Sequence, residues 1–368
     1  GQNDRGREQL DRARELVRGR PASPSAARVL VEVSRYAMLS DETEEAVRTG
    51  REALEMADVL GLGELVPAAL INIGSARGNA GDEGGIADLE RAIEIAHATN
   101  NPDLARAYNN LAAMQANAER AYELQLQGKE AADRLGNAPV GRYVEAQLLL
   151  SAFELGHWDE FRPAADEFIA ACEAGSPHYA ESYVRERRAD ILLARDDPGS
   201  AAADAARALE LAREAKDPQA LQPALAVQVR VDLALRRLAE ARRTARELLS
   251  SLEGAKTGFG VTTLALHAET LGVAEQLPAV LSGLPDRPWI RAAAAVLVGE
   301  FERAADIAAE HAWRVDEAEL RLRAAEALLE AGRRPEADVQ LQKALGFYRS
   351  VGATRYIREG ERLLAATA

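Results

Sequence analysis

The sequence predicts an all-α protein built from repeated helical hairpins, and three observations support this fold class. Apolar residues recur at spacings of three and four, β-branched residues are sparse, and an alanine-centred pattern returns at a nearly constant interval. Segments rich in Ala, Leu, Glu and Arg alternate with short breaks that contain Pro, Gly, Asn or Asp. The 76 alanines among 368 residues supply the small side chains that closely packed helices need.

The repeat is clearest in a three-residue pattern whose middle residue is usually small. Its middle residues are Ala53, Ala92, Ala131, Phe168, Ala208, Leu248 and Ala344. The first six are 39, 39, 37, 40 and 40 residues apart. A second small residue stands seven positions earlier in most units, at Ala46, Gly85, Ala201, Ala241 and Ala337, although Leu124 and Phe161 break this rule. Seven residues are two helical turns, so both small positions face the same neighbouring helix.

The first helix of each hairpin is expected to begin at a proline that follows an N-capping residue. This expectation rests on Pro24, Asn101-Pro102, Pro139, Ser176-Pro177 and Asp217-Pro218. We expect eight or nine hairpins, preceded by a lone helix at residues 7–20 and closed by a terminal helix from about residue 353.

These paired helices resemble the tetratricopeptide repeat. The resemblance rests on the small positions above and on Ile73-Gly74 and Leu111-Ala112 in the first helices, and the period near 39 residues is similar to that of the longer MalT-like variety. It implies a right-handed α-solenoid of eight or nine hairpins. We expect a regular array over residues 1–256 and less regular repeats with a C-terminal capping helix over 257–368, because glycines and Leu-Pro pairs interrupt the later pattern.

The segment 331–356 resembles the C-terminal end of large bacterial signalling proteins. In those proteins a tetratricopeptide array follows a STAND or AAA-type ATPase, often with a class III nucleotide cyclase or a LuxR-type DNA-binding domain. The resemblance, and the start at Gly1 instead of Met, imply a sensor or scaffold segment of a larger protein that carries no catalytic residue.

Charge and composition exclude several classes of protein. The net charge of −14 argues against nucleic acid as a partner, since phosphates would be repelled. The single Cys172 excludes an intramolecular disulfide and suits the cytoplasm, and we expect it to be buried or half-buried. No apolar run approaches the ~20 residues that cross a bilayer, so no membrane association is expected.

No motif in the sequence predicts an enzyme active site. A phosphate-binding loop is not completed at Gly128-Lys129 or at Gly61-Leu62-Gly63. No two of the five histidines stand three or four residues apart, as they would on a helix that binds a metal. We therefore expect no catalysis, no cofactor and no metal.

Arginines cluster at Arg185, Arg187 and Arg188, where they could form a basic patch for an acidic peptide or phosphate. Glu186 and Asp190 are interleaved with them, which favours a solvated, ion-paired helix face instead.

A row of polar residues emerges when 20 or 21 positions are counted back from each repeated small position. The row contains Asn72, Asn110, Gln147, Arg187 and Gln228, together with Glu32 and Arg323 at the ends of the array; Arg106, Tyr143 and Tyr183 stand one turn earlier, and Asn109 precedes Asn110. By the resemblance, this row lies in the inner groove that binds a partner's backbone or carboxylate, and aromatic and arginine side chains suit such interfaces.

Several interpretations of the row stay open. The partner could be a protein, a peptide or the upstream domains of the same polypeptide, or the groove could bind a small-molecule effector. Alternatively, the polar side chains hydrate the face or join neighbouring helices, in a structural scaffold that self-associates.

Overall fold

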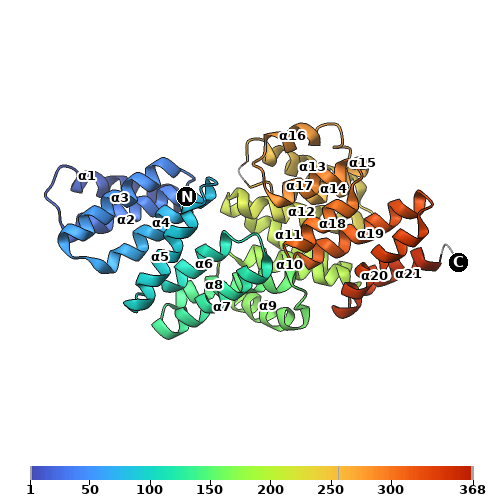
Figure 1. Ribbon diagram of the computed structural model, residues 1–368, viewed down its shortest axis with the longest axis horizontal. Coiled ribbons are helices and arrows are strands. Elements are labelled where there is room, and N and C mark those ends of the chain that lie inside the picture. The colour runs from blue at the N-terminus through green and yellow to red at the C-terminus, as the bar shows by residue number, and fades with distance from the viewer. Residues whose placement is uncertain (1, 256, 366–368) are drawn as a thin grey trace. The chain divides into compact units, whose positions relative to one another are not determined.

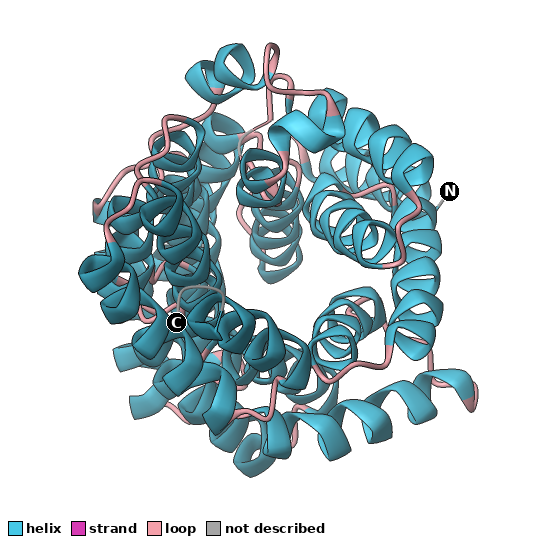
Figure 2. Cartoon of the chain, turned by 90° about the vertical axis from the view of Figure 1, so that its right-hand side faces the viewer, coloured by secondary structure: helices cyan, strands magenta, loops and turns pink. Residues whose placement is uncertain are grey.

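The computed structural model describes residues 2–255 and 257–365 of the chain. Within this part the chain consists of helices and connecting loops, without a strand (Figure 2). The predicted all-α fold class is confirmed.

Short connecting segments join successive helices along the chain (Figure 1). They are α1 (Gln2–Val17), α2 (Pro24–Leu39), α3 (Thr43–Leu60), η1 (Gly63–Leu65), α4 (Val66–Asn79), α5 (Gly84–Ala98), α6 (Leu104–Ala113), α7 (Ala118–Leu135), α8 (Ala138–Glu154), α9 (Trp158–Glu173), α10 (Glu181–Ala194), α11 (Pro198–Ala215), α12 (Pro218–Ala234), α13 (Leu238–Leu252), α14 (Val261–Leu266), α15 (Ala268–Leu271), α16 (Leu277–Gly283), α17 (Pro288–Leu297), α18 (Phe301–Glu310), α19 (Arg314–Glu330), α20 (Arg334–Ser350) and α21 (Thr354–Ala365).

Successive helices form hairpins, from α2–α3 to α12–α13 and again from α17–α18 to α19–α20. Helices α2 and α3, α4 and α5, α10 and α11, and α19 and α20 pack most extensively against each other. First helices also contact the first helix of the next hairpin, as α2 does α4 and α10 does α12. We call the first helix of each hairpin its A helix and the second its B helix.

The small residues that define the repeat lie where the helices pack most tightly. Ala201 and Ala208 of α11 are completely buried. At Gly85 of α5, a Cβ atom would lie 2.4 Å from the Gly74 carbonyl oxygen of α4, so only glycine permits this approach. The same burial holds for the other alanines of this register: Ala46, Ala53, Ala92, Ala241, Ala337 and Ala344.

Two of the predicted helix starts show clear capping. The Ser23 hydroxyl accepts a hydrogen bond from the Ala26 backbone N–H at 3.2 Å, just before α2. The Asp217 carboxylate accepts one from the Gln219 backbone N–H at 2.9 Å, just before α12. An oxygen acceptor there satisfies an N–H group that the helix leaves unpaired.

Two other predicted starts are wrong by a few residues. Helix α10 begins at Glu181 and not at Pro177, because a turn intervenes in which the Ala180 N–H bonds the His178 Nδ1 at 3.2 Å. Helix α6 begins at Leu104, and the Asn101 side chain accepts the Asp103 N–H within the preceding turn.

Helices become short after residue 257. Helices α14, α15 and α16 have 6, 4 and 7 residues, whereas α12 has 17. Gly258 and Gly260 adopt φ angles of +73° and +79°, which favour glycine and stop a helix from continuing through them. The proposed division of the array at residue 256 stays a prediction.

Contacts group the chain into two compact units. Unit 1 comprises residues 1–116 and 120–148, and unit 2 comprises residues 117–119 and 149–368. Helices α7 and α8 each contribute to both units.

Within unit 2, residues at the end of α10 contact residues at the start of α21. The Arg358 guanidinium donates to Asp196 at 2.7 Å, and the Thr354 hydroxyl bonds the same carboxylate at 3.0 Å. Arg195 donates to the Val351 carbonyl at 3.0 Å. Helices about 160 residues apart in sequence are therefore neighbours in this unit.

Candidate functional site

The arginines of α10 identify two opposite sides of an A helix. Arg185 and Arg187 are two positions apart, so their side chains leave the helix about 200° apart. Arg185 contacts Asp204 of the B helix α11, whereas Arg187 contacts Phe153 and Glu154 of the preceding A helix. We call the side of the A helices that carries Arg187 the inner face.

In unit 1, two predicted site residues connect neighbouring A helices. Asn72 of α4 is completely buried and donates to the Val31 carbonyl of α2 at 2.9 Å. Its Oδ1 accepts a hydrogen bond from Arg106 of α6 at 3.0 Å, and Arg106 also pairs with Asp103 at 3.1 Å. The geometry supports the interpretation that these side chains hold the stack of helices together.

The remaining predicted residues of unit 1 differ in exposure. Asn110 donates to the Ser75 hydroxyl at 2.9 Å, which connects α6 to α4. Asn109 is buried, and within the described residues its Oδ1 has no hydrogen-bond partner. Tyr143 and Gln147 are half-buried on α8. Arg106 and Asn110 on α6 are half-buried as well, whereas Asn72 and Asn109 are buried.

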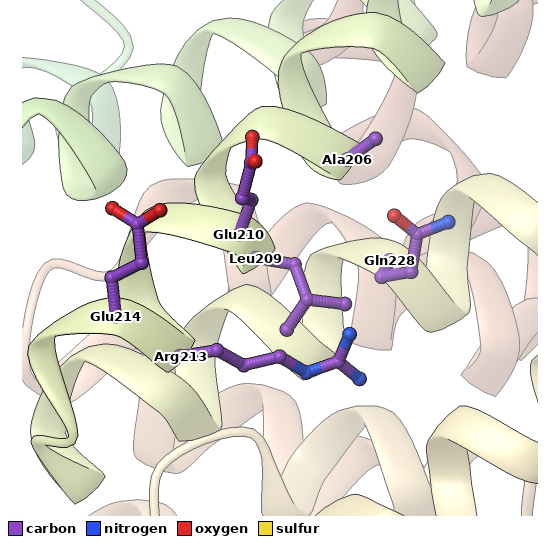
Figure 3. Close-up of a pocket in the computed structure, with 6 residues that line it drawn as sticks. All are labelled: Ala206, Leu209, Glu210, Arg213, Glu214 and Gln228. Atoms are coloured by element: carbon purple, nitrogen blue, oxygen red, sulfur yellow. The ribbon is translucent and has the colours of Figure 1, made fainter.

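In unit 2, Gln228 lies apart from the inner face. It lines a shallow groove of about 460 Å³ together with residues of α11. Figure 3 shows the Glu210 and Glu214 carboxylates directed away from the Arg213 guanidinium. Arg213 also pairs with Glu247 of α13 at 2.6 Å, so the groove lies over the B helices. The lining residues are Ala206, Leu209, Glu210, Arg213, Glu214 and Gln228.

A shift of one residue in register explains the position of Gln228. Asp190 of α10 and Arg230 of α12 pair directly, and they are 40 residues apart. The same interval places Val227, not Gln228, at the point equivalent to Arg187, and Val227 is buried in the core.

The arginine cluster of α10 is ion-paired, as its sequence favours, but its main part is buried instead of solvated. Arg185 has 6% exposure and donates to Glu181 at 2.8 Å, to Asp204 at 3.0 Å and to Glu173 at 2.6 Å. Arg188 shares Asp204, at 2.6 Å. The network joins α9, α10 and α11, and a buried cation is tolerated there because several carboxylates surround it.

Helix α19 repeats this arrangement. Arg321 has 4% exposure and donates to Glu317 at 3.2 Å, to Asp306 at 2.8 Å and to Gln340 at 3.2 Å. In both helices a glutamate precedes the arginine by four residues and a hydrogen-bonding partner follows it by nineteen. This motif, Glu-x-x-x-Arg-x-Arg at 181–187 and 317–323, is visible in the sequence but is not among the features predicted from it.

On the inner face, the Arg187 guanidinium makes only long contacts with carboxylates. The guanidinium lies 3.7 Å from Glu154 and 3.7 Å from Asp190, which is longer than a hydrogen bond. It sits 5.2 Å from the centre of the Phe153 ring. Within the described residues its buried Nε has no hydrogen-bond partner. Tyr183, one turn earlier, is half-buried and packs against the core of unit 2.

Arg230 and Arg323 are firmly paired on the same side of their helices. Arg230 donates two hydrogen bonds to Asp190, at 3.0 and 2.6 Å, and a third to Thr263 of α14 at 2.7 Å. Arg323 bonds Glu326 at 2.5 Å and Glu359 of α21 at 2.8 Å. Both guanidinium groups therefore stabilise contacts between helices.

Two carboxyl groups of this face have strongly raised pKa values. Burial raises the pKa of Glu186 to about 8, and within the described residues its Oε1 has no hydrogen-bond partner. Burial also raises the pKa of Asp316 to about 7, and the charges of Glu154 and Glu319 add to this shift. In both cases burial is the larger cause, and the nearby Arg187 and Arg230 lower the two pKa values in part.

No group of three or more histidine, cysteine, aspartate or glutamate side chains is arranged to hold a metal ion. No helix in this part of the chain is long and apolar enough to span a membrane. Cys172 is buried, as expected.

No family model and no curated protein matches the sequence of this chain. Solved structures do share its fold. The apo form of the quorum sensor NprR from B. thuringiensis is similar at a TM-score of 0.51 and 12% identity, covering 93% of this chain and 94% of that one. The apo form of RapI aligns at a TM-score of 0.48 and 12% identity, covering 91% and 99%. The fold is thus that of tetratricopeptide-like helical-repeat proteins.

Proposed function

We propose that the chain is a non-catalytic helical-repeat module that binds a protein or peptide partner along the inner face of its A helices. The observation that carries this proposal is Arg187, whose guanidinium lies on that face without hydrogen-bonded partners in the described part of the chain. Buried donors without partners cost free energy, and a ligand that supplies acceptors would recover it.

The regulatory context is part of this proposal. NprR, whose fold this chain shares over nearly its full length, is described as a quorum sensor. Together with the resemblance of segment 331–356 to bacterial signalling proteins, this supports a sensor segment of a larger signalling or transcription-regulatory protein. Binding would then shift the balance between two arrangements of the array and its neighbouring domains.

Selection of random displayed peptides on the chain tests the proposal. We expect selected peptides to bind Arg187→Ala at least about tenfold more weakly than the wild-type chain, because Arg187 contributes charge-assisted hydrogen bonds. Glu210→Ala, in the groove over the B helices, is the matched control and should leave affinity unchanged. Failure to select any peptide, or loss of binding in Glu210→Ala alone, would contradict the proposal.

A further inference from the structure

Six helices of unit 2 form a closed ring of neighbours. Contacts run from α10 to α12, from α12 to α14 and from α14 to α17. Leu320 of α19 belongs to the same buried core as residues of α17, and Arg323 of α19 bonds Glu359 of α21 at 2.8 Å. The ring returns to its start where Arg358 of α21 donates to Asp196 at the end of α10, at 2.7 Å.

The junction between α21 and α10 depends on exposed polar side chains. The Asp196 carboxylate accepts from both Arg358 and the Thr354 hydroxyl, at 2.7 and 3.0 Å. Arg195 donates to the Val351 carbonyl at 3.0 Å. The side chain of Arg358 is 64% exposed, and exposed ion pairs contribute little to stability. Hydrogen bonds of this kind form and break without a large loss of buried apolar surface.

The junctions between successive hairpins of the ring are apolar instead. Val229 of α12, Leu264 of α14 and Ala293 of α17 are completely buried in one core. Beside α21, the Trp158 and Phe347 rings add one edge-to-face contact with a centroid distance of 6.1 Å. Separation of α21 from α10 also breaks no connection between consecutive helices. The ring therefore opens at the lowest cost in free energy between α21 and α10.

The inner face of unit 2 is enclosed while the ring is closed. The side chains of Asp190, Arg230 and Arg187 on this face are 12%, 21% and 24% exposed. The ion-paired Arg213 and Glu247 on the B helices are 52% and 41% exposed. A partner segment that contacts Arg187 therefore needs more space than the closed ring provides.

We propose that Asp196, Thr354 and Arg358 form a clasp that holds unit 2 closed and restrains access of the partner to its inner face. The partner binds the state in which α21 has separated from α10. Its apparent affinity is then the affinity of this open state reduced by the fraction of molecules that are open. This inference rests on the proposed function and adds its regulation.

Asp196→Asn in the full chain tests the clasp. It removes the charge that Arg358 binds, and asparagine tolerates the φ angle of +64° at this position as aspartate does. We expect a peptide selected on the wild-type chain to bind the variant about fivefold more tightly, because the open fraction rises. The control Asp286→Asn removes the same charge from a side chain that is 79% exposed and paired with Arg291, and it should change affinity less than about twofold.

A distance measurement shows the opening itself. Spin labels are attached at Gly199→Cys on α11 and Glu361→Cys on α21, two exposed positions, while the native Cys172 is buried. We expect electron–electron double resonance to give one short distance for the wild type without peptide and a longer distance with saturating peptide. Asp196→Asn should increase the share of the longer distance without peptide, and Asp286→Asn should not.

Other outcomes separate the two proposals. Unchanged affinity in Asp196→Asn, or a short distance that persists with bound peptide, would overturn the clasp while binding on the inner face stands. Weaker binding by Asp196→Asn would show that the contact supports binding, which also overturns the clasp. If neither chain selects a peptide, both proposals fail. Should Asp196→Asn lose its helical circular dichroism, Arg358→Gln breaks the same pair from α21 and takes its place, with the same expected gain.

Discussion

Helices α10 and α19 carry the same pair of arginines in the same register, but the second arginine of each pair has a different role. Arg185 and Arg321 are both buried, and each has partners in its own hairpin and on the preceding B helix. Arg323 is bonded to Glu326 and to Glu359 of the next A helix. Arg187 has no equivalent of Glu359.

The difference shows how one repeated position can serve either the array or a ligand. Where the next A helix supplies a carboxylate, the inner arginine holds two helices together. Where it does not, the guanidinium stays available, here at 3.7 Å from its nearest carboxylates. The predictions that follow use this contrast between α10 and α19.

The largest effect is expected from Arg185→Ala. Its removal leaves the buried Glu181 without its cation and leaves the buried Asp204 with Arg188 alone, which costs about 3 kcal/mol of unfolding free energy. Arg321→Ala should cost less, about 2–3 kcal/mol, because Gln340 is neutral and Asp306 is 70% exposed. Thermal and urea unfolding measure both. A loss below about 1 kcal/mol for Arg185→Ala would contradict the role of this network.

Glu186→Gln should change the pH dependence of stability. The folded-state pKa near 8 exceeds the ordinary value of 4.5, so the stability that Glu186 contributes is present below about pH 4.5 and is lost as the pH rises through 8. The uncharged amide side chain of the variant avoids this loss, and we expect about 2 kcal/mol more stability than wild type at pH 9.

The control for this titration is Glu210→Gln, on the exposed side of α11. Its unfolding curve should follow that of the wild type between pH 4 and 9. An identical pH profile for Glu186→Gln and wild type would show that Glu186 is not held protonated by burial near Arg187, Asp190 and Arg230.

Arg323→Ala and Arg187→Ala compare the two inner arginines directly. We expect Arg323→Ala to lower the unfolding free energy by about 1–2 kcal/mol, because it breaks two charge-assisted hydrogen bonds. Arg187→Ala should cost less than about 1 kcal/mol, since it breaks none. Equal losses in calorimetric melting would remove the contrast between the two helices.

A smaller effect concerns Asp316→Asn. Burial and the charges of Glu154 and Glu319 raise the pKa of Asp316 from 3.8 to about 7, so the stability that Asp316 contributes is present below about pH 4 and is lost as the pH rises through 7. The variant should therefore lose less stability than the wild type between pH 5 and 8, by about 1 kcal/mol at most. Identical pH profiles in urea unfolding would contradict this shift.

The fold could be predicted because its repeat rests on local packing. Alanines such as Ala201 and Ala208 are buried wherever two helices approach closely, and their spacing is visible in the sequence. The start of α10 could not be placed, because the turn at His178 depends on a side-chain hydrogen bond.

The site could be predicted only in part. Counting along the repeat located Asn72, Asn110 and Arg187, but Gln228 is 41 residues after Arg187, one more than the 40 that separate Asp190 and Arg230, and it lies off the inner face. Whether an arginine of the inner face has hydrogen-bond partners depends on residues of other helices. Glu359, for example, lies 36 positions after Arg323, on α21. The repeat pattern does not predict such pairings or the contact between α10 and α21.

Photo-crosslinking of a selected peptide tests the central claim most directly. The peptide carries a benzophenone group in its middle, is bound to the full chain and irradiated, and the crosslinked residues are identified by mass spectrometry. We predict crosslinks to the A helices of unit 2, chiefly α10, α12 and α19, on the side that carries Arg187. Crosslinks confined to the B helices α11, α13, α18 and α20 would contradict binding on the inner face.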